Sequence, residues 1–451
     1  MNMRLSELAG NGLGVLLGDD VSVSGVSIDT RTVAKGNLFF AIKGPRFDGH
    51  AFCREASEKG AAAVVVEQDV DASVPMLKVA DTRQALKDIA AFWRQKFSLP
   101  VVAVTGSNGK TTVKEMIACI FTGRGEALAT QGNLNNELGV PLTLFRLNDA
   151  CNYAVIEIGA NHPGEIESIV DLVKPQVSVI TMIGPTHLEG FGSLQGVVKA
   201  KAEIFSGLDA NGIAVINRDD RFYNDMSALT GGRRVCSFGF AQDATVRGDY
   251  SKGRFTITVD NQSVSVDLKV LGRHNRQNAL AAAAACLACS FSLEEIQQGL
   301  EKMLPVPGRL QRRPEVTGYQ LIDDTYNASP SSVMAAIDVL AEQPGERCLV
   351  LGDMKELGEK VDELHFQIGD YAKKAGVDLL LCTGEHVAHA VDAFGPSQGF
   401  LADNMESLVK EFEKKVPRQC NVLVKGSRSS HMENFIEGLL AGRPHAGGHT
   451  Q

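Results

Sequence analysis

Residues 105–112 read Thr105-Gly106-Ser107-Asn108-Gly109-Lys110-Thr111-Thr112, between an apolar run that ends at Val104 and a helix-like stretch, residues 113–118. This pattern predicts a phosphate-binding loop: a strand is followed by a glycine turn, and a lysine and a hydroxyl stand at the start of a helix. Backbone N–H groups and the positive end of the helix attract a polyphosphate there. In such a loop Lys110 neutralises the outer phosphates and Thr111 can bind Mg²⁺. A tight turn that happens to contain a lysine is the alternative, but the flanking strand and helix favour a site for ATP or GTP.

The loop departs from the general phosphate-loop motif at one position. That motif has its first glycine where this chain has Val104, so the loop is the compact form Gly-x-x-Gly-Lys-Thr. We expect Lys110 to be exposed when no nucleotide is bound. No Asn-Lys-x-Asp segment, which would read guanine, follows a later strand, and this favours ATP over GTP.

The composition is that of an ordinary globular protein of 451 residues, with 22% charged and 44% hydrophobic residues. A net charge of −9 and the lack of a basic run argue against a nucleic-acid partner. Nine scattered cysteines fit a reduced compartment better than a secreted fold. The N-terminus lacks an apolar signal core, and the longest apolar run, residues 279–289, is too short to cross a bilayer. We expect a cytoplasmic protein without stable membrane insertion.

The order of apolar runs predicts an α/β protein with three domains. They are a small N-terminal α/β domain (1–83), a central P-loop ATPase-like domain with a mainly parallel sheet (84–308) and a C-terminal Rossmann-like α/β domain (309–451). Near-continuous apolar runs are typical of parallel strands covered on both faces. The expected strands are residues 37–42, 61–66, 153–158, 177–181, 213–217, 348–351, 379–382 and 421–425.

Other segments complete this organisation. A hairpin is expected from strands 255–260 and 263–270 around Asn261-Gln262, followed by an alanine-rich helix, residues 279–288. Residues 199–205 are expected to begin a helix, on which two lysines would ordinarily form a solvated face. Residues 304–308 are the predicted linker, and 441–451 a frayed tail. The last domain has no G-x-G-x-x-G after a strand, so its topology need not mean a dinucleotide.

An ATP site also needs a carboxylate for Mg²⁺, and the second strand of the central domain ends at one. Glu157 lies in an otherwise apolar run, where uncompensated burial of a charge is costly, so a solvated strand end explains it poorly. His187 follows the next strand, at the edge where open α/β sheets bind ligands, although a single loop histidine often has no such role.

Taken together, these motifs resemble the Mur ligases, the ATP-dependent amide-forming enzymes of bacterial peptidoglycan precursor synthesis. The resemblance extends over essentially the whole chain, in the same order. The motifs that carry it are residues 105–112, Glu157, His187, Lys201-x-x-Ile204-Phe205, 272–278, 307–309 and 323–327. Residues 131–137, 324–330, 352–358 and 425–428 resemble the member that joins D-alanyl-D-alanine to UDP-N-acetylmuramoyl-tripeptide. The Asp-Asn-Pro-Arg signature of the diaminopimelate-adding member is absent.

The resemblance implies a reaction through an acyl phosphate, with ATP as substrate and Mg²⁺ as cofactor. It implies that Lys110, Glu157, His187 and Lys201 are catalytic. It also implies that Thr111 and Glu157 bind one Mg²⁺, and that His187 and Lys201, as a carbamate, bind a second. The implied ATP-binding residues are Gly106, Ser107, Asn108, Gly109, Lys110, Thr111, Thr112, Asn275, Asn278, Arg309 and Asp324.

The same resemblance assigns the other two substrates to the outer domains. Candidates for the uridine nucleotide are Ser27, Asp29, Arg31, Lys43, Asp48 and His50, although ordinary turn chemistry around residues 47–49 also explains some of them. Lys425 and Arg428 are the candidate cations for the carboxylate of D-alanyl-D-alanine. We expect a monomer. The rival interpretations are a folylpolyglutamate synthase, which lacks the first domain, and a phosphate-loop phosphotransferase or regulatory ATPase.

Overall fold

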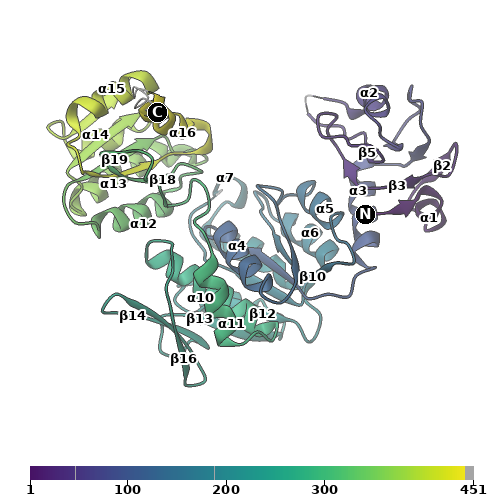
Figure 1. The fold of residues 1–451 in the computed structure, drawn as a ribbon, viewed down its shortest axis with the longest axis horizontal. Coiled ribbons are helices and arrows are strands. Elements are labelled where there is room, and N and C mark those ends of the chain that lie inside the picture. The colour runs from purple at the N-terminus through teal and green to yellow at the C-terminus, as the bar shows by residue number, and fades with distance from the viewer. Residues whose placement is uncertain (46, 187, 442–451) are drawn as a thin grey trace, which may run out of the picture.

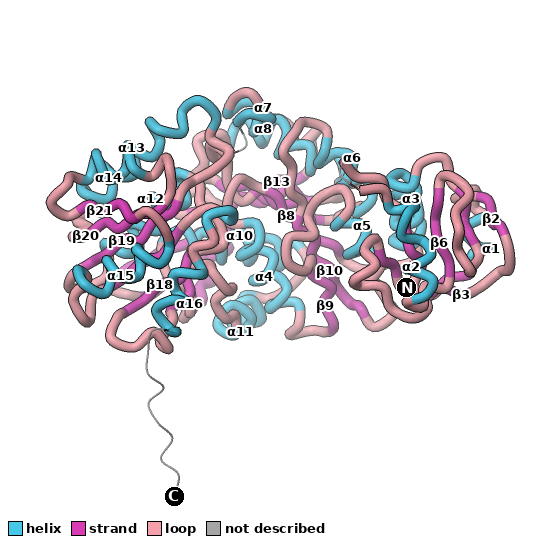
Figure 2. The backbone as a smooth tube through the Cα atoms, turned by 90° about the horizontal axis from the view of Figure 1, so that it is seen from above, coloured by secondary structure: helices cyan, strands magenta, loops and turns pink. Residues whose placement is uncertain are grey.

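The computed structural model describes residues 1–45, 47–186 and 188–441, and it contains three α/β units that follow one another along the chain (Figure 1). The two outer units lie at opposite ends of the molecule and each adjoins the central unit in both views (Figure 2). Each unit is built on a mainly parallel sheet, which confirms the predicted fold class. The proposed domain boundaries remain predictions.

The first unit has a five-stranded sheet in the order β2-β7-β6-β5-β4, parallel except for β2 against β7. Its strands are β2 Val15–Leu17, β4 Val26–Ser27, β5 Leu38–Phe40, β6 Ala63–Val66 and β7 Met76–Lys78, and the pair β1 Met3–Arg4 and β3 Ser22–Val23 stands apart. The helices are α1 Leu5–Gly10 and α2 Cys53–Glu58. Phe40 packs against Phe145 of the central unit, with ring centroids 6.3 Å apart.

Helix α3 (Thr82–Arg94) connects the first and central units. Asp81 begins it, because its carboxylate accepts the N–H groups of Arg83 and Gln84. The buried face of α3 belongs to the same apolar core as residues of both sheets. The indole of Trp93 also donates to the carbonyl of Leu147 at 3.1 Å, so α3 fixes the first unit to the central one.

The central unit has a nine-stranded sheet in the order β16-β15-β14-β13-β12-β11-β8-β10-β9. It is parallel from β14 to β9 and antiparallel from β14 to β16. The strands are β8 Val101–Thr105, β9 Glu126–Ala129, β10 Cys151–Glu157, β11 Val177–Ile180, β12 Ile213–Asn217, β13 Arg234–Gly239, β14 Val246–Ser251, β15 Arg254–Val259 and β16 Gln262–Val266. The helices are α4 Lys110–Phe121, α5 Gly139–Leu144, α6 Glu165–Val173, α7 Leu188–Phe191, α8 Leu194–Ala202, α9 Tyr223–Ala228, α10 Arg273–Ala288 and α11 Leu293–Lys302.

Alternate residues of the central strands enter two different cores, as the period of two in a strand requires. Val101 and Ala103 pack with α3, α5, α6 and α8, whereas Val102 and Val104 pack with α4, α10 and α11. Because both faces are covered, the strands are apolar throughout, and the phosphate loop emerges from the buried strand β8.

The third unit has a six-stranded sheet in the order β17-β18-β22-β19-β20-β21, parallel except for β17. Its strands are β17 Gln311–Arg312, β18 Gln320–Asp324, β19 Arg347–Gly352, β20 Leu379–Thr383, β21 Gly399–Ala402 and β22 Asn421–Lys425. Helices α12 Pro330–Ala341, α13 Val361–Lys374 and α14 Ala388–Phe394 cover one face, and α15 Met405–Lys415 and α16 Glu433–Ala441 the other.

Two sequence predictions about the hairpin need correction. Its turn is Asp260–Asn261, both with positive φ (47° and 68°), and its second strand ends at Val266. An Asp-Asn pair tolerates the left-handed conformation that a two-residue hairpin turn needs, which Gln262 would adopt less readily.

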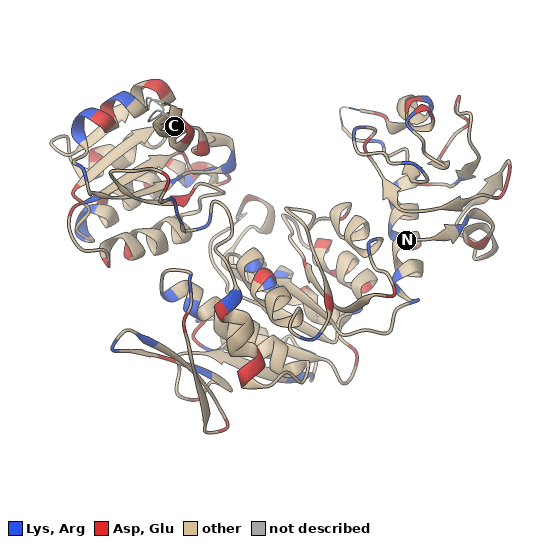
Figure 3. Ribbon diagram, viewed as in Figure 1, with Lys and Arg blue, Asp and Glu red and all other residues tan. Residues whose placement is uncertain are grey.

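All nine cysteines are free. Within the described residues, no helix is both long and apolar enough to cross a membrane. Basic and acidic residues are interspersed over all three units (Figure 3).

Candidate functional site

A cavity of about 780 Å³ lies where the central and third units meet. Its walls include the loop after β8, the end of β10, the start of α10, and the segments that follow β18, β19 and β22. These segments all leave the carboxyl ends of parallel strands, or begin a helix, which is where open α/β sheets bind ligands. Of the residues predicted for ATP and metal, the structure gathers eleven around this cavity. They are Ser107, Asn108, Gly109, Lys110, Thr111, Thr112, Glu157, Asn275, Asn278, Arg309 and Asp324.

Two glycines give the loop its shape. Gly106 has φ +143°, and a Cβ there would lie 2.0 Å from the hydroxyl of Thr181. Gly109, which caps α4, has φ +83°, and its Cβ would lie 2.4 Å from Oδ1 of Asn278. Only glycine combines these backbone angles with such close neighbours. The loop is therefore held against β11 and α10, with the N-terminus of α4 behind it.

The ammonium of Lys110 is folded back onto its own loop. Nζ donates to the carbonyl of Gly106 at 2.8 Å and, more weakly, to that of Ser107 at 3.4 Å. The side chain is half-buried, so the prediction that it is exposed without nucleotide is wrong. Burial lowers the pKa of Lys110 and the charge of Arg309 lowers it further, while Glu157 opposes both effects.

Glu157 is buried at the end of β10, with one carboxylate oxygen paired and the other free. Oε1 accepts from the amide of Asn135 at 2.8 Å. Oε2 is buried and has no hydrogen-bond partner among the described residues. A buried carboxylate oxygen without a donor is costly unless a cation is present, so this position fits a Mg²⁺ ligand.

Lys201 is placed differently from the sequence expectation. Residues 199–205 end a helix instead of beginning one: α8 stops at Ala202 and a 3₁₀ turn, Glu203–Gly207, follows. The real start is Ser193, whose hydroxyl caps Gly196. This register leaves Lys199 exposed and turns Lys201 inward, at 1% exposure.

Among the described residues, the ammonium of Lys201 has few partners. It lies 5.3 Å from the centre of the Phe191 ring and donates a long bond, 3.4 Å, to the carbonyl of Ala160, which lines the cavity. Burial, helped by the charge of Lys110, lowers the pKa of Lys201 to about 7. A large fraction of this amine is therefore neutral at neutral pH. His187, the other candidate for the second metal, lies outside the described residues.

Arg309 connects the linker to the phosphate loop. Its guanidinium stacks on Tyr326, 4.2 Å from the ring centre, and donates to the hydroxyl of Thr111 at 3.1 Å. A second bond between the units joins Asn108 to Ser331 at 3.0 Å. The third unit thus contacts the loop directly. The resemblance implied that Arg309 binds ATP, whereas the bond from Asn108 to Ser331 was not foreseen from the sequence.

The first turns of α10 present amides to the cavity. Asn275 donates to the carbonyl of Leu271 at 2.7 Å, and Asn278 donates to Oδ1 of Asn275 at 3.1 Å. His274 lines the same wall, and burial, together with the charges of Lys425 and Arg276, lowers its pKa to about 4. The imidazole is therefore neutral at neutral pH and adds no charge to this wall.

Asp324 and Lys425 form a buried ion pair at 2.6 Å, and Lys425 also donates to the carbonyl of Asn327. Burial raises the pKa of Asp324 and the neighbouring Lys425 opposes the rise. Both of the ammonium's contacts are internal to the third unit. Arg428, which pairs with Glu433 at 3.0 Å and is exposed, is the more accessible cation on this wall.

The six residues predicted for the uridine nucleotide lie in the first unit, and none of them lines this cavity. The carboxylate of Asp29 pairs with Arg31, and the hydroxyl of Ser27 bonds to the backbone of Asp29. Asp48 binds the ring of His50 at 2.6 Å and forms an isolated bridge with Lys43. His50 also accepts from the N–H of Glu67, so Asp48 and His50 stabilise their own turn.

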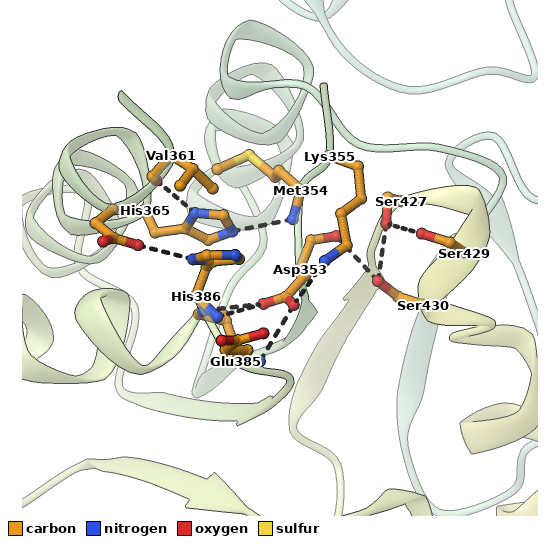
Figure 4. Close-up of polar contacts among 12 residues, drawn as sticks. Asp353, Met354, Lys355, Val361, His365, Glu385, His386, Ser427, Ser429 and Ser430 are labelled. Atoms are coloured by element: carbon orange, nitrogen blue, oxygen red, sulfur yellow. Dashed lines mark hydrogen bonds and ion pairs between the residues drawn. The ribbon is translucent and has the colours of Figure 1, made fainter. Parts of the chain in front are cut away.

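The segment between β19 and α13 carries Lys355 and Leu357 to the cavity. The sequence indicated no role for the two residues that anchor this segment, Asp353 and His365. Asp353 accepts the backbone N–H groups of residues 385–387 at 2.9 to 3.1 Å (Figure 4). His365 is buried, accepts the N–H of Met354 at 3.0 Å and bonds the carbonyl of Val361 at 2.7 Å. It therefore joins the two ends of the segment. Residues 352–358 were part of the family resemblance. The role of His365 was missed because its partner, Met354, lies eleven residues away, and no sequence motif links the two.

The compact phosphate loop and the buried carboxylate of Glu157 define a phosphate-loop site that lies between the central and third units. The chain belongs to the Mur ligase family. Three family models match it in succession: "Mur ligase family, catalytic domain" over residues 22–94, "Mur ligase middle domain" over 104–286, and "Mur ligase, glutamate ligase domain" over 308–428.

Relatives of known identity match nearly the whole chain. The UDP-N-acetylmuramoyl-tripeptide--D-alanyl-D-alanine ligase of Escherichia coli (strain K12) is 43% identical over 447 residues, covering 97% of this chain and 98% of its own length. The crystal structure of MurF from Acinetobacter baumannii superposes with a TM-score of 0.90 at 34% identity, covering 98% and 99% of the two chains. MurF ligase from Thermotoga maritima in complex with ADP gives 0.83 at 28% identity, covering 93% and 97%.

Proposed function

We propose that this protein joins D-alanyl-D-alanine to UDP-N-acetylmuramoyl-tripeptide in cytoplasmic peptidoglycan precursor synthesis, converting ATP to ADP and phosphate. The observation that carries the proposal is the 43% identity to the Escherichia coli ligase over nearly the whole of both chains. The ADP complex of the Thermotoga maritima relative supports the assignment of the nucleotide.

The chemistry follows from the poor electrophilicity of a carboxylate. In the first step a terminal carboxylate oxygen of the tripeptide forms a bond to the γ-phosphorus of ATP, and the bond from that phosphorus to the bridging oxygen of ADP breaks. In the second step the amine of D-alanyl-D-alanine attacks the acyl carbon, loses a proton and displaces inorganic phosphate. Both reactants of the first step are anions, so the site must supply positive charge.

The residues of the cavity meet this requirement. Lys110 and the loop N–H groups hold the β- and γ-phosphates, and for this the Lys110 ammonium exchanges its bonds to Gly106 and Ser107 for phosphate oxygens. Arg309, already at the hydroxyl of Thr111, supplies a second cation from the third unit. Asn275 and Asn278 bind the adenine side, and Asp324 the ribose.

The donor set fits Mg²⁺. Thr111 and Glu157, with its unpaired Oε2, would hold one ion, and His187 with carbamylated Lys201 a second. The metal would neutralise phosphate charge in the transition state. A carbamate forms from a neutral amine and CO₂, and the low pKa of Lys201 supplies that amine.

The other substrates come from the outer units. The uridine nucleotide occupies the first unit near Asp29, Arg31 and Lys43, and Ser27, Asp48 and His50 shape that surface. In the third unit Arg428 binds the carboxylate of D-alanyl-D-alanine, and Lys425 acts through its pair with Asp324. We propose that the enzyme acts as a monomer.

Isotope transfer tests the proposal. UDP-N-acetylmuramoyl-tripeptide carrying ¹⁸O in its terminal carboxylate is incubated with ATP, Mg²⁺ and D-alanyl-D-alanine, in parallel with a diaminopimelate and a lysine form of the tripeptide. The ligated pentapeptide and phosphate that contains one ¹⁸O are the expected products. Unlabelled phosphate without the pentapeptide would indicate an ATPase, and a phosphorylated metabolite would indicate a phosphotransferase.

A further inference from the structure

A second cavity, of about 350 Å³, lies on the central unit away from the nucleotide wall of α10. Strand β14 pairs with β13 only through Val246 and Arg247, and then continues as part of the protruding ribbon of β14 to β16 (Figure 1). The cavity opens where β14 leaves β13, beside the start of α10. Gly248 permits the approach of the helix, because a Cβ there would lie 2.7 Å from Leu280.

Three guanidinium groups line this cavity: Arg247 from β14, and Arg273 and Arg276 from α10. Within the described part of the chain, none of the three forms an ion pair with a carboxylate. The single acidic residue in the lining is Asp249, whose carboxylate accepts from the hydroxyl of Ser251 at 2.9 Å. We call this the arginine pocket; its charged groups sum to +2.

The guanidinium groups are held in place by neutral contacts. Arg273 stacks on Phe240, 4.1 Å from the ring centre, and Arg276 stacks on Tyr250 at 3.8 Å. Arg247 donates to the side-chain oxygen of Gln242 at 2.8 Å. Cation–π stacking fixes the plane of a guanidinium but uses none of its N–H groups. The Nε of Arg276 is buried and has no acceptor among the described residues.

We propose that the arginine pocket binds a phosphoryl group, at a site distinct from the nucleotide cavity. Converging planar guanidinium forks match the geometry of phosphate oxygens, and an excess of two positive charges suits a dianion better than a single carboxylate. One face of Phe240 and one face of Tyr250 are covered by arginines, so the charged groups that these rings orient are what the pocket offers a ligand. The positive end of α10 adds to the attraction.

The pocket uses a different face of α10 from the nucleotide site. Arg273 and Arg276 are three residues apart and face the arginine pocket, whereas His274, Asn275 and Asn278 face the large cavity. A ligand in the arginine pocket therefore leaves the phosphate loop free. The two sites can be separated by filling the loop first.

The test measures binding of inorganic phosphate, diphosphate and ribose 5-phosphate by titration calorimetry at low ionic strength. The full-length protein is loaded beforehand with one molar equivalent of a non-hydrolysable ATP analogue and Mg²⁺, so that the phosphate loop is occupied without an excess of free nucleotide. The test variant is Arg273→Gln/Arg276→Gln. The matched control is Arg234→Gln/Arg254→Gln, which removes two exposed arginines from β13 and β15 outside the pocket.

We expect the parent and the control variant to bind one phosphoryl ligand per chain, and the test variant to bind it at least about tenfold more weakly, as loss of charge-assisted hydrogen bonds implies. Equal affinity for all three ligands identifies free phosphate as the natural occupant, and tighter binding of ribose 5-phosphate identifies a phosphorylated metabolite. No binding by the parent, or an equal loss in both variants, overturns the proposal. Unchanged affinity for the ATP analogue shows that the test variant is folded.

Discussion

Lys201 combines deep burial with a pKa of about 7, a pairing that suits a lysine which becomes an anion by carbamylation. An unmodified ammonium would repel Mg²⁺. We predict that Lys201→Ala loses most turnover and that acetate at high concentration partly restores it by filling the space. Lys201→Arg should stay inactive with or without acetate, because it keeps the positive charge and fills the space. Lys199→Ala, at the exposed neighbour, is the control and should be near normal.

The same pKa gives turnover a pH dependence. The neutral amine reacts with CO₂, so the carbamate is favoured above pH 7 and is lost as the pH falls through about 7 and the amine is protonated. Rates at several pH values, with and without added bicarbonate, measure this effect. Full activity of Lys201→Arg, or a parent rate that bicarbonate never changes in acid, would contradict the carbamate.

Lys110→Ala should abolish turnover while the protein stays folded. Removal of one charge that stabilises the transferred phosphoryl group costs about 10²–10³-fold or more in kcat. The ammonium bonds two loop carbonyls, so we expect a loss of about 1 kcal/mol in the free energy of unfolding, more than for an exposed lysine. Steady-state kinetics and thermal unfolding check the two parts separately. Normal ligation by the folded variant would exclude this loop as the active site.

At the scale of single residues, the sequence indicated the groups whose chemistry depends on their neighbours in the chain. Lys110 and Thr111 follow a glycine turn, and Glu157 interrupts an apolar strand. It did not indicate Asn135, whose amide meets Glu157 from 22 residues away, or the bond from Asn108 to Ser331, 223 residues apart. Such pairs depend on the tertiary fold, which no local spacing encodes.

At the scale of elements, His365 holds the two ends of the segment between β19 and α13 together. This contact predicts that the stability of the protein depends on pH. Burial lowers the pKa of His365 below its ordinary value in the unfolded chain, near 6.5. The neutral ring accepts from Met354, and the neighbouring charged groups are Asp353, Asp362 and His386. A depressed histidine pKa stabilises the fold above about pH 6.5, and this contribution is lost as the pH falls below it.

We therefore expect His365→Gln, which keeps an acceptor for Met354, to lower stability at pH 7.5 but to flatten its fall between about pH 6.5 and 5. It should also raise the KM for D-alanyl-D-alanine more than that for ATP, because Lys355 and Leu357 line the cavity. Melting temperatures across this range and kinetics at pH 7.5 measure both effects. His389→Gln, at a partly exposed histidine beside the same Asp362, is the control. If the melting temperature falls equally steeply with pH in the parent, His365→Gln and His389→Gln, the role of His365 is refuted.

Element ends were harder to predict than element types. The alanine-rich run did form a helix, but α10 begins at Arg273, earlier than the run itself, and α8 ends where a helix was expected to start. Both helices begin with polar residues. Ser193 caps the start of α8, and the first turns of α10, from His274 to Asn278, face the cavity. Hydrophobic periodicity cannot show such ends, because it records burial and not capping.

At the scale of the whole molecule, alternating strands and helices were enough to predict three α/β units, because each apolar strand needs helices on both faces. The sequence could not give the order of strands. β8 lies between β10 and β11, and β22 between β18 and β19, and these neighbours depend on long-range pairing. The cavity between the second and third units, with Arg309 and Ser331 at the loop, was likewise beyond local patterns.

The placement of the three substrates predicts closure of the first unit. The lining of the large cavity comes from the central and third units of the described chain, while the residues assigned to the uridine nucleotide lie in the first unit, at the far end of the molecule (Figure 1). The tripeptide must reach from one to the other, and its acyl phosphate must be shielded from water. Small-angle scattering should show a smaller radius of gyration with the ATP analogue and UDP-N-acetylmuramoyl-tripeptide together than with either one. Lys110→Ala, which weakens the nucleotide site, should shift this compaction to higher nucleotide concentration. An unchanged radius in the saturated parent complex would mean that the tripeptide spans a fixed gap, and the closure hypothesis would then fail.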